Sequence, residues 1–577
     1  MKSRVIFLSL ILLPLLTLPL FAQGHTQPFA VSIDSSMAGW PQVGYAVNMD
    51  FFLAVWEDYR NGNSDIYAQV LESNGAPLGD NFPLCKAEGD QFWPQLAYDN
   101  YWGRFLVVFE DWRKPKNGDI RGIFIRADGQ FYHPPTADDD HSFLICANPG
   151  NIYTCSVAFN WREKVYLVVW GDFRNDPTAK SMTGADVYGQ LISDTGELLP
   201  PPSPADSSQN FAIAADQDFY ESVADVSYSP ITNEFLVVYG TNKGLVLGQR
   251  VNHLGQLLTK DGSAAPANSA AAPFTISDQF KNGPDCLQAK VQFNSDFGTP
   301  QEGWCEAEVI WKGIHHPDRM DNDVWGQRIG FFREGDKFVA KYVSLTGDTS
   351  LTDRSNHSIS NQKDFVGVAE IAYNEKDNEF LVIWGDPRNK GWAKQDLYGQ
   401  RLWVHGTRNE MTFLADDRVN TVTDSENIPY FVSGDRYEGS LVGIAHGDSR
   451  NDFMVVYTYE DPLLGRESDI MGFRVHGNWP TGVTDRKMQP DQVVLHAGYP
   501  NPFNASTRIR FSTERDGDLA LRVFDINGRA VATLLQEHKS AGEHQVDWHA
   551  DGRPSGVYVI QLQAGDAVRN QKILLIK

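Results

Sequence analysis

A short apolar run, a polar loop and a second, partly apolar run recur together along most of the chain. The apolar runs FLAVW, FLVVF, YLVVW, FLVVY, AEVIW, FLVIW and FMVVY end at Trp56, Phe109, Trp170, Tyr239, Trp311, Trp384 and Tyr457. Most of them are apolar at successive positions, which is typical of strands that are covered on both faces. The pattern therefore predicts seven copies of one β unit.

Each copy contains enough extended sequence for four strands. A shorter strand precedes the apolar run, as in PQLAY at 94–98, and a second strand follows it, as in DIYAQV at 65–70. A small residue at the centre of this second strand predicts the close approach of a bulky aromatic side chain from the next unit. We therefore expect an all-β chain with a seven-bladed β-propeller over residues 29–477. An open solenoid is the alternative, but it requires capping ends that the sequence does not contain.

The two ends of the repeated region complement each other. Residues 29–33, FAVSI, resemble the last strand of a copy, yet no copy precedes them. The seventh copy stops after DIMGFRVHG at 469–477 and lacks that last strand. We predict that the N-terminal strand completes the last sheet and closes the ring.

The first residues have the pattern of a signal peptide over 1–22. Lys2 and Arg4 precede an almost unbroken apolar stretch, and Ala22 offers a small residue for cleavage. The later sequence contains no comparable apolar span, so we expect no membrane span in the mature chain. The formal net charge of −24 argues against nucleic acid as a partner.

The chain has five cysteines, which is few for an exported protein of 577 residues. Cys286 and Cys305 are the best candidates for a disulfide, if they lie on neighbouring strands of one hairpin. The alternative is that all the cysteines are small buried side chains.

The C-terminal region has a different pattern. After a linker at 478–494, short strands separated by the turns DINGR, SAGEH and RPSG predict a small Ig-like β-sandwich. The motifs are YPNPFN at 499–504, LRVFDINGR at 521–529, AGEHQVDW at 541–548, PSGVYVIQL at 554–562 and a final KILLIK. With them, residues 495–577 resemble the type A C-terminal sorting domain of the type IX, or Por, secretion system, although Ala505 stands where proline is frequent.

The resemblance implies how the protein is exported from the cell, and it implies no activity. It implies passage through the periplasm and the outer membrane, contact with the type IX secretion machinery, and removal of the tail. The cargo then stays on the cell surface or enters the medium. An Ig-like domain with an unrelated binding role is the alternative.

Charged residues recur in the loops that follow the apolar runs. They are Asp58, Arg60 and Asp65; Asp111, Arg113 and Asp119; Asp172, Arg174 and Asp186; and Asp386, Arg388 and Asp396. The spacing predicts a structural network in which each guanidinium lies between two carboxylates and ties the ends of a hairpin. Calcium is the competing interpretation, but a fixed positive charge so close opposes a second cation.

Two further groups break the regular pattern. One loop of the fifth copy holds His315, His316, Asp318, Asp321 and Asp323, which are metal-ligating types at a spacing that matches no named motif. A solvated irregular loop is the alternative there. Trp40 and Trp93 each precede a proline between copies, where an exposed indole would stack on a sugar and a buried one would act as a wedge.

The sequence contains no nucleophile elbow, zinc-protease motif, P-loop or dinucleotide fingerprint. We therefore expect a surface or secreted module that binds a glycan or a protein, with no cofactor other than calcium to consider. A polysaccharide hydrolase or lyase that uses acidic residues at the propeller axis is the alternative, so the question of catalysis stays open. A structural scaffold is the third hypothesis.

Overall fold

The computed structural model consists of strands and turns. It describes residues 26, 28–32, 36–114, 118–126, 129–147, 152–175, 185–200, 210–215, 221–265, 273–277, 286–294, 304–313, 323–343, 356–360, 366–387, 396–403, 428–431, 437–460, 468–476, 493–495, 503–513, 517–525, 529–540, 542–550, 552–564 and 567–575. Within these residues no helix occurs, and so none is available to cross a membrane. The prediction of an all-β chain is confirmed.

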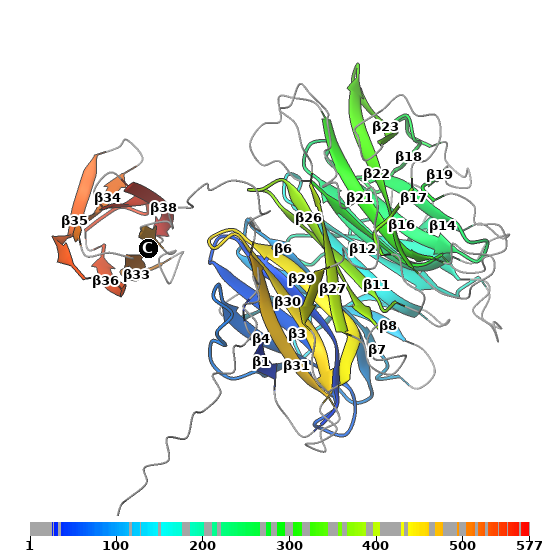
Figure 1. Cartoon of the computed structure of the whole chain (residues 1–577), viewed down its shortest axis with the longest axis horizontal. Helices are drawn as coiled ribbons and strands as arrows, with labels where there is room; N and C mark the ends of the chain where they lie inside the picture. Colours follow the sequence, from blue (N-terminus) through cyan, green and yellow to red (C-terminus); the bar gives the residue numbers. More distant parts are fainter. Residues whose placement is uncertain are drawn as a thin grey trace, which may run out of the picture.

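The described strands up to residue 476 form seven antiparallel sheets of four or five strands (Figure 1). The first sheet contains β2 (Ala38–Ala46), β3 (Phe51–Asp58), β4 (Asp65–Glu72) and β5 (Phe82–Cys85). The second contains β6 (Gln91–Asp99), β7 (Arg104–Asp111), β8 (Asp119–Arg126), β9 (Phe131–Tyr132) and β10 (Phe143–Ala147). The third contains β11 (Ile152–Asn160), β12 (Val165–Asp172), β13 (Asp186–Ser193) and β14 (Phe211–Ala214).

The remaining four sheets follow in chain order. The fourth contains β15 (Glu221–Ser229), β16 (Glu234–Thr241), β17 (Val246–Asn252), β18 (Leu257–Leu258) and β19 (Phe274–Thr275). The fifth contains β20 (Cys286–Phe293), β21 (Trp304–Gly313), β22 (Asp323–Glu334), β23 (Lys337–Val343) and β24 (His357–Ser358). The sixth contains β25 (Ala369–Asn374), β26 (Glu379–Asp386), β27 (Asp396–Trp403) and β28 (Ile428–Phe431). The seventh contains β29 (Tyr437–Gly447), β30 (Asp452–Glu460), β31 (Asp469–His476) and β1 (Phe29–Ser32).

The first strands of successive sheets lie next to one another. β2 contacts β6, and the contacts continue through β11, β15, β20 and β25 to β29, which in turn contacts β2. The sheets thus follow one another around an axis in a β-propeller-like arrangement. We call these seven strands the innermost strands, and we call the side with the loops between second and third strands the loop face.

The N-terminal strand completes the seventh sheet, as predicted. β1 pairs antiparallel with β31, and Phe29 lies opposite Gly472 and Ala30 opposite Met471. Figure 1 shows the two strands, blue and gold, side by side. The first and last strands of the repeated region therefore belong to one sheet.

Apolar packing between sheets explains the repeated apolar runs. All eight positions of β3 and of β7 are buried. Leu53 and Val55 of the first sheet pack in one cluster with Phe105 and Val107 of the second. A strand that is covered on both faces has to be apolar at successive positions.

The glycines of the third strands accommodate bulky side chains of their own sheet. A Cβ on Gly122 would lie 2.8 Å from Phe143, and one on Gly472 would lie 2.8 Å from Phe29. Both phenylalanines belong to the outermost strand of the same sheet. The expectation that the aromatic ring comes from the next unit is therefore wrong at these positions.

The C-terminal region forms two further antiparallel sheets. One contains β32 (Val493–Leu495), β33 (Ser506–Thr513) and β36 (Gly542–His549). The other contains β34 (Gly517–Asp525), β35 (Ala530–Lys539), β37 (Gly556–Ala564) and β38 (Ala567–Leu575). Buried residues of both sheets, among them Phe511, Trp548 and Ile560, share one apolar cluster.

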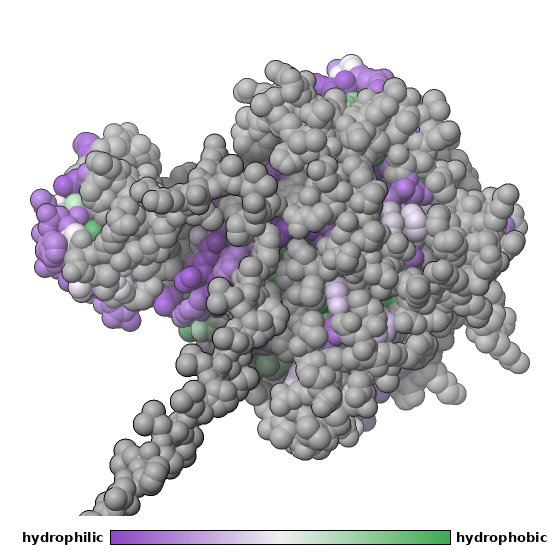
Figure 2. Space-filling view, in the orientation of Figure 1, coloured by the Kyte–Doolittle hydropathy of each residue, from purple (hydrophilic) through white to green (hydrophobic). Residues whose placement is uncertain are grey.

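On the face drawn in Figure 2, most of the coloured residues are hydrophilic. Figure 2 shows purple residues over the C-terminal sheets and over parts of the repeated region. The large exposed apolar side chains, such as Tyr101 and Trp102, are few among the described residues.

Candidate functional site

The innermost strands break their register at the loop face. The pairing with the second strand shifts in β2, β6, β11, β15, β20 and β29. Four residues at these bulges have positive φ although they carry side chains: Trp40 (48°), Trp93 (50°), Thr154 (42°) and Gln288 (57°). Such a backbone conformation is unfavourable for a residue other than glycine, and strain of this kind gathers at functional sites.

The two tryptophans of these bulges meet. Trp40 and Trp93 are half-buried, and their ring centroids lie 5.7 Å apart with the planes at 79°. They lie within β2 and β6, so their predicted place in loops between sheets is wrong. A bulge adds a residue without ending the strand, which explains why the strand continues through each Trp-Pro pair.

A buried carboxyl group lies beside two of the bulges. The Trp93 N–H donates to Glu57 Oε1 at 2.7 Å, and the Thr154 N–H donates to Glu110 Oε1. Trp112 Nε1 donates to the other oxygen of Glu110 at 3.2 Å. Burial raises the pKa of Glu57 to about 8 and raises the pKa of Glu110 well above its usual value. Two carboxylic acids with raised pKa values therefore lie at the loop face, and each caps the bulge of the next sheet.

A second set of mostly polar residues lies on the innermost strands, further from the loop face than the bulges. Seven residues occupy the same register position on the innermost strands: Gln42, Gln95, Ser156, Asp225, Lys290, Glu370 and Gly443. We call them the axial ring. Gly443 fits here because a Cβ would lie 2.8 Å from the backbone of β2.

The axial ring connects sheets that are far apart in the sequence. Lys290 Nζ lies 2.8 Å from Glu370 Oε1, which also accepts from Gln42 Nε2 at 3.4 Å. Ser156 Oγ donates to Asp225 Oδ1 at 2.7 Å. Burial alone lowers the pKa of Lys290, but the carboxylates of Glu370 and Asp225 raise it above its ordinary value. The ammonium group is therefore charged, and its ion pair joins the fifth and sixth sheets.

The recurring acidic loops have a structural arrangement that differs from the predicted one. Arg60 binds Asp58 through Nε at 2.8 Å and Nη2 at 2.6 Å, and Trp56 Nε1 donates to the same carboxylate at 2.9 Å. Asp65 lies opposite Asp58 in the register but accepts from Asn61 at 2.6 Å. The expectation that the guanidinium lies between the two carboxylates is therefore corrected, because an amide takes the second one.

In the third sheet, too, the arginine binds the first carboxylate and an asparagine binds the second. Arg174 binds Asp172 at 2.5 Å through Nη2, while Asp186 accepts from Asn175. In the sixth sheet, Asp386 and Asp396 again lie opposite each other, and Trp384 Nε1 donates to Asp386 at 3.0 Å.

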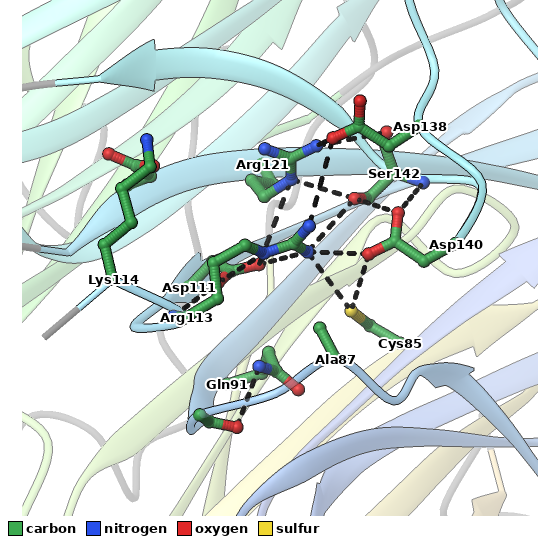
Figure 3. Close-up of polar contacts among 12 residues, drawn as sticks. Cys85, Ala87, Gln91, Asp111, Arg113, Lys114, Arg121, Asp138, Asp140 and Ser142 are labelled. Atoms are coloured by element: carbon green, nitrogen blue, oxygen red, sulfur yellow. Dashed lines mark hydrogen bonds and ion pairs between the residues drawn. The ribbon is translucent and has the colours of Figure 1, made fainter.

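In the second sheet the guanidinium reaches the loop that precedes the outermost strand, β10 (Figure 3). Arg113 lies between Asp111 at 2.5 Å and Asp140 at 2.7 Å. Asp119 pairs instead with Lys114 at 3.0 Å. The loop that carries Asp140 is therefore fastened to the end of β7.

Most of the predicted metal-binding loop and one arginine of the predicted structural network lie outside the part of the chain that the structure describes. His315, His316, Asp318, Asp321 and Arg388 lie outside the described residues. Asp323 is buried at the start of β22, where Ser360 Oγ donates to it at 3.4 Å. Among the described residues, no group of three or more His, Cys, Asp or Glu side chains is arranged to hold a metal ion. Metal binding in that loop, calcium included, therefore stays a prediction.

The proposed disulfide is wrong. Cys305 is a free, buried thiol. Cys286 lies opposite Gly313, at the other end of β21 from Cys305. The strand length between Cys305 and Gly313 is about 26 Å at ~3.3 Å per residue, far beyond the reach of a disulfide.

Sequence reasoning missed the carboxyl groups Glu57 and Glu110 and the axial ring. A signal was present, because a polar residue recurs in the short first strand of most copies. The apolar runs, however, are more regular and gave no reason to align the first strands on their polar positions.

The comparisons with known proteins give a clear result for the C-terminal region. Residues 497–577 match the family described as a secretion system C-terminal sorting domain. No curated protein matches the sequence. The resemblance stated from the motifs is thereby confirmed, and the domain indicates export by the type IX system to the cell surface or the extracellular space.

The solved structures that match are distant. The Hadza microbial sialidase Hz136 is 8% identical, with a TM-score of 0.36 and coverage of 72% of this chain and 73% of that one. The Trypanosoma rangeli sialidase in complex with the inhibitor DANA is 9% identical, with a TM-score of 0.35 and 87% of each chain covered. A subtype N11 neuraminidase-like protein of A/flat-faced bat/Peru/033/2010 is 10% identical, with a TM-score of 0.35 over 77% of this chain and 89% of that one. Scores of this size support no inference about function.

Proposed function

We propose that the chain is an exported binding protein whose loop face recognises a glycan next to the axis. The observation that carries this proposal is the pair Trp40 and Trp93, two half-buried indoles that meet edge to face on strained backbone. An aromatic surface that is rigid and partly exposed suits the apolar face of a sugar ring. The strain at both positions supports a role beyond packing.

The architecture that presents this pair is a seven-bladed propeller over residues 29–477, closed by the N-terminal strand. The contacts of the innermost strands and the pairing of β1 with β31 support it. A signal peptide at 1–22, a linker at 478–494 and an Ig-like sandwich at 495–577 complete the proposed domain organisation. The glycan partner belongs to the propeller, whereas the secretion machinery is the partner of the C-terminal domain.

A glycan array followed by calorimetry on the exported protein tests the binding function. Trp40→Ala and Trp93→Ala are each expected to weaken binding of an array hit at least tenfold, equal to about 1.4 kcal/mol. Trp102→Ala is the matched control, because that indole is exposed in the turn between β6 and β7, on the opposite face. The proposal fails if no glycan binds, or if all three variants bind like the wild type while they remain folded.

A polysaccharide hydrolase is the second candidate, and Glu57 is the observation that favours it. A carboxyl group with a pKa of about 8 is protonated at neutral pH and could serve as a general acid. The hydrogen bond from the Trp93 backbone N–H fixes this carboxyl group beside Trp93. Loss of polysaccharide hydrolysis in Glu57→Gln, with glycan binding retained, would favour the enzyme.

A further inference from the structure

Two imidazoles face each other at the outer edge of the second sheet. His133 follows β9, and His141 precedes β10. Their Nδ1 atoms lie 3.2 Å apart, and the ring centroids are 4.3 Å apart. We call residues 133–142 the rim loop.

The backbone and an aromatic ring hold His141 in place. Its φ is +70°, and its ring stacks on Phe131 at a centroid distance of 4.3 Å. The His141 N–H donates to the Asp138 carbonyl at 3.0 Å, and the Asp138 N–H donates to the Ser142 carbonyl at 2.8 Å. The side chain therefore projects from a closed turn.

The arginines of Figure 3 fasten this turn to the sheet. Arg113 binds Asp140 at 2.7 Å, and Arg121 binds Ser142 Oγ at 2.8 Å and also pairs with Asp138. Arg121 lies on β8, which pairs with both β9 and β10. The turn that carries His141 is thus held against the sheet before any ligand binds.

The separation of the two nitrogens suits a transition-metal ion. Two imidazole nitrogens at ~2.0–2.1 Å from a tetrahedral ion lie about 3.3 Å from each other. Imidazole is the preferred ligand of zinc, copper and nickel, whereas calcium prefers oxygen. Without metal, one ring donates an N–H to the other. A bound ion replaces that hydrogen bond when both Nδ1 atoms are unprotonated and both protons reside on Nε2.

We propose that His133 and His141 form a surface site for a first-row transition-metal ion such as Zn²⁺. The two nitrogens occupy two positions of the ion, and water fills the others. The site is independent of the glycan function, because it lies at the rim rather than at the axis.

Calorimetric titration of the exported protein with Zn²⁺ tests the proposal. The chain is purified without a polyhistidine tag. The wild type is expected to bind one equivalent of Zn²⁺ that both His133→Gln and His141→Gln lose. His253→Gln, in the turn between β17 and β18, is the matched control and retains it. Lowering the pH to 5 is expected to abolish the same equivalent, because protonated imidazoles do not bind metal.

Titration with Ca²⁺ distinguishes binding by the two histidines from non-specific attraction of cations to the negatively charged protein. Ca²⁺ is expected to leave the histidine-dependent Zn²⁺ binding unchanged. Equal Zn²⁺ binding in the wild type and in both rim-loop variants would overturn the proposal and leave a simple imidazole–imidazole hydrogen bond. Displacement of the ion by Ca²⁺ would overturn the assignment of the ligands.

Discussion

At the scale of single residues, the polar side chains of the repeats divide into two groups. Asp58 and Asp172 are buried, and each accepts from an arginine guanidinium and from an indole N–H, so they hold hairpin ends together. Glu57 and Glu110 lie one position earlier and face the bulges of the next sheet. Adjacent residues of a strand point to opposite faces, and this alternation separates the structural carboxylates from those at the candidate site.

The raised pKa of Glu57 makes the stability of the protein depend on pH. The folded state holds this proton more tightly than the unfolded state, with a pKa of about 8 against 4.5. The group therefore stabilises the fold at pH values below 4.5, and that contribution is lost as the pH rises toward 8. Glu57→Gln retains an acceptor for the Trp93 N–H but cannot ionise. Its Tm relative to that of the wild type is expected to rise between pH 5 and pH 8.

Thermal unfolding followed by circular dichroism across this range measures the difference. Glu88→Gln removes an exposed carboxylate and controls for the loss of one charge. A Tm difference for Glu57→Gln that is the same at pH 5 and pH 8 would refute the raised pKa.

At the scale of elements, six of the seven third strands carry a central glycine, and β4 carries Ala68 instead. The Cβ of Gly122→Ala would lie 2.8 Å from Phe143 and 3.0 Å from Ile145. Both neighbours are fully or almost fully buried, so they have little room to move. The substitution is expected to lower the free energy of unfolding by about 1–3 kcal/mol, the usual cost of overpacking.

Urea denaturation compares this variant with a matched one. Gly39→Ala is also in a strand, but nothing lies within 4 Å of its added Cβ, so we expect little change. Equal unfolding midpoints for the two variants would show that the packing around Phe143 is looser than described.

The same elements show how far sequence reasoning reaches. The second strands were predictable because burial on both faces leaves an apolar run such as FLVVF. The pairing of β1 with β31 was predictable because one end lacks a strand that the other end supplies. The axial ring was not, since Ser156 and Asp225 meet across 69 positions and loops of unequal length hide their common register. A bulge is equally invisible, because the extra residue at Trp40 or Trp93 leaves the apolar pattern intact.

At the scale of the whole molecule, the pairing of the first and last strands can be tested by a cross-link. Ala30 and Met471 lie directly opposite each other. In an antiparallel pair, opposite Cβ atoms are about 4.5–5.5 Å apart, close to the separation in a disulfide. The double variant Ala30→Cys with Met471→Cys is expected to form a disulfide under mild oxidation and to gain about 2–4 kcal/mol of stability.

Electrophoretic mobility under non-reducing conditions detects this bond, since it closes a loop that spans most of the chain. Ala30→Cys alone controls for pairing with a native thiol. Failure of the double variant to cross-link while it remains folded would contradict the register of β1 and β31.

The seventh sheet contains the first and the last strand of the repeated region, so it can be completed only late in translation. β1 leaves the ribosome first, but its hydrogen-bonding partner in β31 is translated more than four hundred residues later. Until then, Gly472 is absent, and Phe29 has only the first sheet, at Gly75, to pack against. A nascent chain that stops short of β31 therefore carries β1 as an unpaired strand, and only translation through His476 supplies its partner.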